Sequence, residues 1–267
     1  MVLSRREFLT TSLLLPLFLF NRRFPLAEAQ FRQGGTYHVD AGVFFGLFTF
    51  NLDGSVEEQI DRAAGRYRVV VAGQGSQIAN RLESVGIIRG RRFLPTATNI
   101  FLDLRGRESR TAIAYDHDRG VIDYHHVSHT FLLGRRREVH DIVHLHPDQQ
   151  VDDVVTVALN YAEGALQTDA TGAFRTYVVR RTRSENEGPD DVQLAGYRAE
   201  IVPLVVSVAH EPVGGRDVGW LDLTRLSSWA RRGTPLRIAF GPDRRPESIQ
   251  ADLVFGSSVR ITFQSSS

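Results

Sequence analysis

The 267-residue sequence contains no cysteine and no lysine, and each absence excludes a class of chemistry. Without cysteine the chain has no disulfides, thiolate metal sites, cysteine nucleophiles or lipid-modified leader cysteine. Without lysine there is no Schiff-base chemistry and no phosphate-loop lysine, and all 32 basic residues are arginine. Apolar residues make up 42% and charged residues 24%, which excludes a disordered, collagen-like or multi-span membrane protein.

The first 29 residues have the features of a cleaved export signal. Residues 4–9 read Ser-Arg-Arg-Glu-Phe-Leu, an apolar stretch follows from Leu13 to Phe20, and Ala27-Glu28-Ala29 matches a signal-peptidase site. The paired arginines before Phe-Leu resemble the twin-arginine signal, and an ordinary secretory leader is the alternative. The apolar stretch is too short to span a bilayer as a helix. We therefore expect a periplasmic mature chain, residues 30–267, that is soluble and has no transmembrane span.

The charge of the mature chain argues against a nucleic-acid partner. Removing the four arginines and two glutamates of the leader leaves 28 arginines against 29 acids, a net charge of −1. The two signs are interspersed, and no basic stripe of the kind that binds phosphate backbones is present.

The mature chain is predicted to be mainly β, because apolar residues alternate in many short segments separated by turn residues. The exception is 151–162, where apolar residues at helical spacing form one stripe and Gly164 supplies a stop. Asp152 and Asp153 are placed in the first turn of this helix, where they would favour the helix dipole. We expect a single domain, a curled antiparallel sheet or β-barrel-like structure with one amphipathic helix.

Three local features are given further interpretations. A phase shift beside Gly46 indicates a β-bulge within one early strand. Residues 76–84 are assigned to a second, weaker helix. Arg135-Arg136-Arg137 is interpreted as a solvated hairpin tip, with a patch for anionic lipid as the alternative.

Short motifs along the mature chain resemble a bacterial exported family, the domain of unknown function 3108. They are the strand pair from Tyr37 to Val69, the segment Ser84–Pro95, the helix start Gln150–Thr156, and Pro242–Pro246 with the turn at Gly256. Ala162 and Glu247 depart from the pattern, which commonly has an arginine and an apolar residue there. The resemblance implies an exported β-rich envelope protein and carries over no catalytic residue.

Seven of the nine histidines lie between positions 117 and 146, the one concentration of metal-ligand chemistry in the chain. On a strand, His140, His144 and His146 would share one face. One register would add His126 to that face, and the other would add His125, His129 and Asp123. Such a face could hold a divalent metal such as zinc, whereas the alternative is a set of solvent-facing strand residues without a ligand.

No other catalytic motif or cofactor fingerprint is present, so the sequence favours a non-enzymatic protein. The first hypothesis is an envelope binding or assembly protein that takes a lipid or glycan in the hollow of its sheet, or another envelope protein as partner. The second is a metal-dependent periplasmic enzyme that uses the histidine cluster. A purely structural subunit of a larger complex is the third.

Overall fold

A computed structural model describes residues 32–146, 149–184, 187–193, 196–212 and 214–265. The predicted export signal, residues 1–29, lies outside these described residues. The strands are β1 (Arg32–Val43), β2 (Phe48–Asp61), β3 (Arg66–Gln74), β4 (Ile78–Arg89), β5 (Arg92–Leu104), β6 (Arg107–Asp116), β7 (Val121–His129), β8 (Arg136–His144), β9 (Ala173–Arg181), β10 (Ala199–Glu211), β11 (Arg216–Leu221), β12 (Leu236–Phe240), β13 (Pro246–Asp252) and β14 (Ser258–Ser265). The helices are α1 (Val154–Ala162) and the short 3-10 turns η1 (Leu223–Arg225) and η2 (Val254–Gly256).

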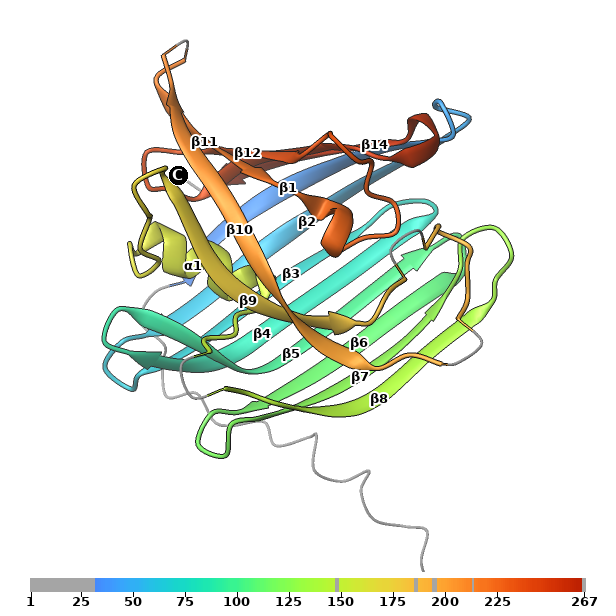
Figure 1. Ribbon diagram of the computed structural model, residues 1–267. Coiled ribbons are helices and arrows are strands. Elements are labelled where there is room, and N and C mark those ends of the chain that lie inside the picture. Colours follow the sequence, from blue (N-terminus) through green and yellow to red (C-terminus); the bar gives the residue numbers. More distant parts are fainter. Residues whose placement is uncertain (1–31, 147–148, 185–186, 194–195, 213, 266–267) are drawn as a thin grey trace, which may run out of the picture.

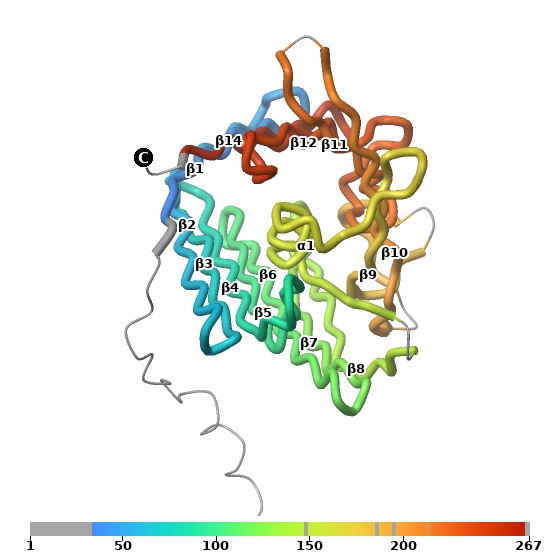
Figure 2. The backbone as a smooth tube through the Cα atoms, turned by 90° about the vertical axis from the view of Figure 1, so that its left-hand side faces the viewer, coloured from blue at the N-terminus to red at the C-terminus, as the bar shows by residue number. Residues whose placement is uncertain are grey.

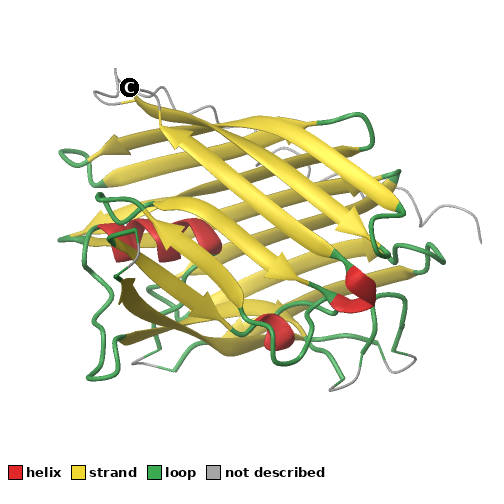
Figure 3. Ribbon diagram, turned by 90° about the horizontal axis from the view of Figure 1, so that it is seen from above, coloured by secondary structure: helices red, strands yellow, loops and turns green. Residues whose placement is uncertain are grey.

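All fourteen strands belong to one antiparallel sheet, in the order β8-β7-β6-β5-β4-β3-β2-β1-β14-β13-β12-β11-β10-β9. The sheet curls on itself (Figure 3), and its two ends come near each other, with β8 close to β10 and β7 close to β9 (Figure 1). Figure 2 looks along the strands and shows α1 inside the ring that they form. The predicted mainly β, barrel-like fold with one helix is confirmed.

Alternation of side chains decides which face of each strand lines the barrel. In β2, Phe50 and Leu52 are 3% and 2% exposed, and in β3, Tyr67 and Val69 are 3% and 2% exposed. Residues two apart point to the same side of a strand, so each strand contributes one apolar row to the interior. The rows from neighbouring strands pack together and around α1.

The early phase shift has a different origin from the predicted bulge. It marks the turn between β1 and β2, which pair antiparallel from Arg32 with Gln59 to Val43 with Phe48. Phe44, Phe45 and Gly46 occupy this turn with φ values of 54°, 57° and 80°. The reversal of the chain, rather than one extra residue, swaps the apolar face, so the bulge interpretation was wrong.

The segment 76–84 is also not a helix. Its residues from Ile78 onward belong to β4, which pairs with β3 from Arg66 with Ile87 to Gln74 with Ala79. The strand has long neighbours on both sides, and the ladder of hydrogen bonds outweighs the weak local helix preference. Here tertiary pairing overrides a local pattern.

The helix α1 lies close to its predicted position but begins differently. Val151 forms a bridge to Tyr177 of β9, and Asp153 is the residue that caps the helix. Neither Asp152 nor Asp153 lies in the first turn, which holds no acidic residue. The predicted placement in the first turn was therefore wrong, although Asp153 as the cap still puts a carboxylate at the N-terminal end of the helix, where it favours the helix dipole. The two carboxylates also have the structural roles described below. The predicted stop at Gly164 agrees with the structure, where it has a φ of 65° directly after the last residues of the helix.

Candidate functional site

A cavity of about 520 Å³ lies inside the barrel, between α1 and the strands β1–β4 and β9–β14. Its volume falls within the range of about 300–1,000 Å³ that small-molecule sites occupy. The helix contributes Val154, Val157 and Ala158, and the facing wall includes Ile238 and Ile261. Val154 is 58% exposed although it lies within the ring of strands. Its exposure agrees with an interior that is hollow on this side of the helix.

Polar groups in the cavity wall are few and occur mainly as pairs. Arg245 donates to Oε1 of Glu58 in a close ion pair, and Glu58 is only 8% exposed. The second carboxylate oxygen, Oε2, has no hydrogen-bond partner among the described residues. Elsewhere in the wall, the Tyr37 hydroxyl donates to Oδ1 of Asn80 at 2.7 Å. An acceptor such as Glu58 Oε2 is costly to leave buried without a partner.

The helix wall of the cavity is fixed in place by Asp153. Its Oδ2 accepts hydrogen bonds from the hydroxyls of Ser84 and Thr98, each at 2.5 Å. Its Oδ1 accepts from the Thr156 backbone N–H at 2.7 Å, and the Thr156 hydroxyl accepts from the Asp153 N–H at 2.9 Å. This capping box joins the start of α1 to β4 and β5 through a carboxylate that is 5% exposed.

Asp152 makes a second anchor, which joins the start of α1 to β5 and β9. It accepts from Arg92 at 2.6 Å, from the Asn160 side-chain amide at 2.9 Å and from the Thr176 hydroxyl. Asn160 in turn bonds both backbone groups of Phe93, at 2.7 and 2.9 Å. Burial raises the pKa of Asp152 above its ordinary value, although the Arg92 guanidinium opposes this effect. The polar side of α1 thus holds the helix against β5 and β9 and leaves its apolar side to the cavity.

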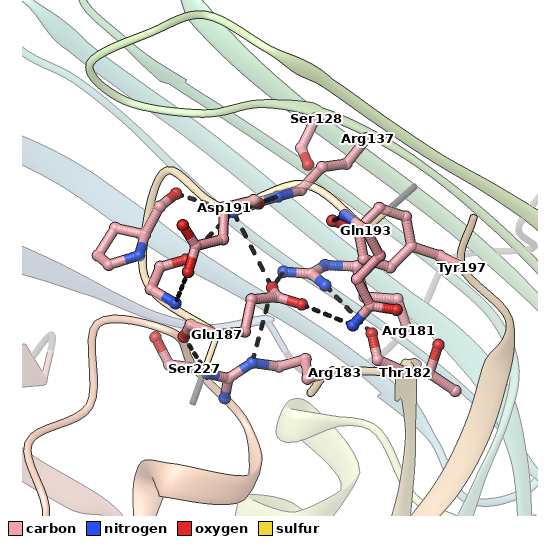
Figure 4. A network of polar contacts seen from close by, with 12 residues as sticks. Ser128, Arg137, Arg181, Thr182, Arg183, Glu187, Asp191, Gln193, Tyr197 and Ser227 are labelled. Carbon is pink, nitrogen blue, oxygen red and sulfur yellow. Dashed lines mark hydrogen bonds and ion pairs between the residues drawn. The ribbon is translucent and has the colours of Figure 1, made fainter. Parts of the chain in front are cut away.

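The gap between the two ends of the sheet is closed by the loop between β9 and β10 (Figure 4). Arg137 of β8 donates to the backbone carbonyls of Gly188, Pro189 and Asp191, and the last two are the nearest. Glu187 accepts from Arg181 and from Gln193, the latter at 3.0 Å. A loop with side-chain hydrogen bonds therefore covers an edge that strand pairing leaves open.

Arg137 corrects the interpretation of the arginine run as a solvated tip. Its side chain is 7% exposed and lies against the loop, whereas Arg135 and Arg136 are exposed. Arg137 is at an inward position of β8, next to Val139 along the same face, and the strand alternation turns only one of the two strand arginines outward. The run is thus split between a structural arginine and surface arginines.

The predicted metal residues do not come together as a set. His140 and His144 lie on the outer face of β8 together with Ile142, and His146 follows the end of the strand. The register pairs His140 with His125, with ring centroids 5.5 Å apart, and His140 Nε2 lies 3.5 Å from Asp123 Oδ1. Within the described part of the chain, no three His, Asp or Glu residues are grouped so that they could hold a metal ion. Metal binding by His140, His144 and His146 stays a prediction.

Among the histidines between positions 117 and 146, His126 has a pKa that the protein environment changes. It lies in β7, and its ring nitrogens contact the hydroxyls of Thr111 at 2.8 Å and Ser128 at 3.0 Å. Burial, followed by the charges of Arg181 and Arg137, lowers the pKa of His126 to about 4. The ring is therefore neutral in the folded protein well below the pH at which an unfolded chain would protonate it.

We expect this histidine to make the protein sensitive to acid. Because the unfolded chain takes up a proton that the folded protein does not, the free energy of unfolding should fall as the pH falls from about 6.5 to about 4. The expected loss is about 3 kcal/mol. Urea unfolding at pH 7 and pH 4 measures it, and His126→Asn should remove most of this difference. The exposed His210 provides the control His210→Asn, which should behave as the wild type. Equal acid losses in wild type and His126→Asn would contradict the prediction.

The cavity and its anchors carry few signals in the sequence. Asp152 and Asp153 stand out for their position near a helix start, but the partners of Asp153 lie 55 to 69 residues away. Glu58 and Arg245 are 187 residues apart and belong to no recognisable motif. The one available signal for Glu58 was an acidic residue within the otherwise apolar inward-facing row of β2. The histidine concentration, by contrast, points to the outer face of the sheet.

No helix in the described part of the chain combines the length and the apolar character that a membrane crossing requires.

Comparisons with known proteins identify no family. No family model matches the chain, and no curated protein matches it. Among solved structures, the chain is similar to a crystal structure described as a beta-barrel-like protein of domain of unknown function DUF1849 from Brucella abortus, with a TM-score of 0.39 and 11% identity over 88% of this chain and 98% of that one. Membership of the family of domain of unknown function 3108 therefore stays a prediction, and what is shown is a mainly β, barrel-like chain with a cavity beside an internal helix.

Proposed function

We propose that the protein is an exported binding protein that takes the acyl part of an amphiphile into its barrel cavity. The observation that carries the proposal is the composition of the wall, where aliphatic and aromatic side chains from α1 and ten strands line about 520 Å³. Export rests on the sequence of residues 1–29. The proposal is of binding without catalysis, because the described lining is mainly apolar and its polar side chains occur chiefly as the pairs Glu58–Arg245 and Tyr37–Asn80.

An acyl chain fits this wall better than a glycan. A sugar presents hydroxyls along its whole length, and each needs a hydrogen-bond partner when it is buried. The lining offers few polar side chains, chiefly the pairs Glu58–Arg245 and Tyr37–Asn80. Each methylene that leaves water for an apolar site contributes about 0.8 kcal/mol. The polar head of the amphiphile would lie at the Glu58–Arg245 pair, where the guanidinium attracts an anionic head and Glu58 Oε2 accepts from a head that carries a hydroxyl or amine.

A series of fluorescent fatty acids of increasing chain length tests the proposal. The free energy per methylene corresponds to a Kd that falls about fourfold for each added carbon. We expect this decrease to continue until the cavity is full and then to stop. The protein would first be unfolded, stripped of lipid and refolded, so that all sites are empty. Oligosaccharides serve as the comparison. Absence of saturable binding, or a Kd that is independent of chain length, would contradict the proposal.

The metal-dependent enzyme remains the second hypothesis for the histidine cluster. Zinc titration of the purified protein distinguishes it, since a metal bound to the folded state would raise the Tm. The observation nearest to it is the contact of His125 with His140, and no described third ligand completes the set.

A further inference from the structure

Large apolar side chains are exposed at one end of the barrel. This end, which we call the aromatic end, is where the segments 44–47, 130–135, 222–235 and 253–257 connect the strands. Most of the large apolar residues that are strongly exposed lie on these segments, namely Phe45 (87%), Leu47 (75%), Leu133 (60%), Leu132 (54%) and Phe255 (54%). Exposed apolar side chains that gather on neighbouring loops mark an interaction surface.

The apolar side chains of the aromatic end form one continuous patch. The Phe45 backbone N–H donates to the Gly256 carbonyl at 3.2 Å, which places Phe45 beside Phe255. The ring of Phe44 lies 5.8 Å from Phe255 and 6.2 Å from Phe131, which directly precedes Leu132 and Leu133. Three loops that are distant in the sequence therefore present their apolar tips together.

The patch packs on Trp229, and three of its phenylalanines have a left-handed backbone conformation. Phe131 and Phe44 both pack on Trp229, with ring centroids 5.6 and 6.3 Å apart. Phe44, Phe45 and Phe255 have φ values between 54° and 57°, a left-handed conformation that bulky residues rarely adopt. Such a conformation is costly for residues other than glycine and is found chiefly where function requires it. Here two of these residues, Phe45 and Phe255, project into solvent.

Basic side chains flank the patch. Arg105, Arg135 and Arg231 are exposed at this end, and none of them makes an ion pair with a described residue. The Arg105 guanidinium lies 4.7 Å from the ring centroid of Phe48. Two acids also lie at this end: Asp190, whose Oδ1 accepts from the backbone N–H groups of Leu132 and Leu133, and the exposed Asp222, which caps η1. Apolar side chains at the loop tips suit the acyl region of a membrane surface, and the arginines beside them suit its anionic headgroups.

We propose that the aromatic end docks on the surface of a bilayer that contains anionic lipid. Phe45, Leu133 and Phe255 insert at the boundary between headgroups and acyl chains, and the flanking arginines pair with the lipid phosphates. Projecting tips suit a bilayer, which deforms around them, whereas a protein partner or a second copy would need a matching hollow. Leu226, three residues before Trp229, lines the cavity, so the docking surface adjoins the proposed lipid site. Docking is nevertheless independent of whether the cavity holds a ligand.

Vesicle flotation tests the docking surface directly. Wild-type protein is expected to float with vesicles of phosphatidylcholine and phosphatidylglycerol, and increasingly so as the share of phosphatidylglycerol rises. The variant Phe45→Asn/Phe255→Asn lacks two large apolar side chains that insert into the bilayer, so its partitioning onto vesicles should fall about tenfold or more. Asparagine tolerates the left-handed backbone, which keeps the turns intact. Arg105→Gln/Arg135→Gln should remove most of the dependence on phosphatidylglycerol.

Ile142 supplies a matched control, because it is 57% exposed on the outer face of β8, away from the four segments of the aromatic end. Ile142→Asn should float as the wild type does. Sedimentation velocity of the same samples reports on self-association. The proposal is overturned if the wild type does not float, if the phenylalanine variant floats equally well, or if that variant changes only the oligomeric state. The Tm and the far-UV circular dichroism spectrum of the variant show that it is folded, so this result stays separate from that for the cavity.

Discussion

Replacing Ala158 by tryptophan is expected to weaken ligand binding strongly while the fold is kept. Ala158 lies on the cavity side of α1, so an indole at this position occupies the space proposed for the acyl chain. Adding atoms to a packed core costs about 1–3 kcal/mol, but here the added ring enters a cavity of about 520 Å³. We therefore expect the Kd for a long-chain fluorescent fatty acid to rise at least about tenfold, or about 1.4 kcal/mol, with little change in Tm.

The control for this experiment is Ala114→Trp. Ala114 is exposed on the outer face of β6, and the same substitution there should leave fatty-acid binding unchanged. If Ala158→Trp proves unstable, Val154→Phe provides a second variant, since Val154 also lines the cavity and is 58% exposed. Unchanged fatty-acid affinity in both folded variants would show that the ligand, if bound, lies elsewhere.

Asp153→Ala is expected to destabilise the protein strongly. The substitution removes the cap of α1, worth about 1–2 kcal/mol, and leaves the hydroxyls of Ser84 and Thr98 without their charged acceptor. Hydrogen bonds to a charged group contribute about 1.5–3 kcal/mol each, and the losses are not fully additive. We expect the free energy of unfolding to fall by about 4 kcal/mol, measured by urea unfolding at neutral pH.

Asp222→Ala is the control that separates the stability lost with a helix cap from the stability lost with the buried hydrogen bonds of Asp153. Asp222 caps η1 through one bond to the Thr224 N–H at 2.8 Å, and it is exposed. Its loss should cost about 1 kcal/mol or less. A comparable small loss for Asp153→Ala would mean that the network around α1 does not hold the helix, and fatty-acid binding should then survive the substitution. If the network acts as described, Asp153→Ala weakens binding as well, because it loosens one wall of the cavity.

The fold class was predictable because it depends on local patterns. The alternating segments predicted the strands, and the stripe at 151–162 predicted the helix to within a few residues. Errors occurred where a local pattern had two physical causes. A change of apolar face accompanies both a bulge and a hairpin, and the residues around Gly46 contain nothing that separates the two. Residues 78–84 carry little preference of their own, and the pairing with β3 decides their conformation.

The candidate site was much less predictable than the fold. Histidines are chemically distinctive in a sequence, yet His140 and His144 lie on the outer face of β8. The apolar residues of the cavity wall look like any core residues in the sequence. Whether an inward apolar row packs solidly or borders a hollow depends on how far the sheet curls and on how much space α1 fills.

The sequence by itself determined the strand-rich character, the helix near 151–162 with its stop at Gly164, and which residues of each strand share a face. These properties depend on periodicity and on backbone preferences within a few residues. The tertiary structure alone decided that the two ends of the sheet approach each other, that Arg137 closes the seam, and that Asp153 receives donors from β4 and β5. The physical reason is that these contacts join residues more than fifty positions apart, and only the closed curvature of the sheet brings them within hydrogen-bonding distance.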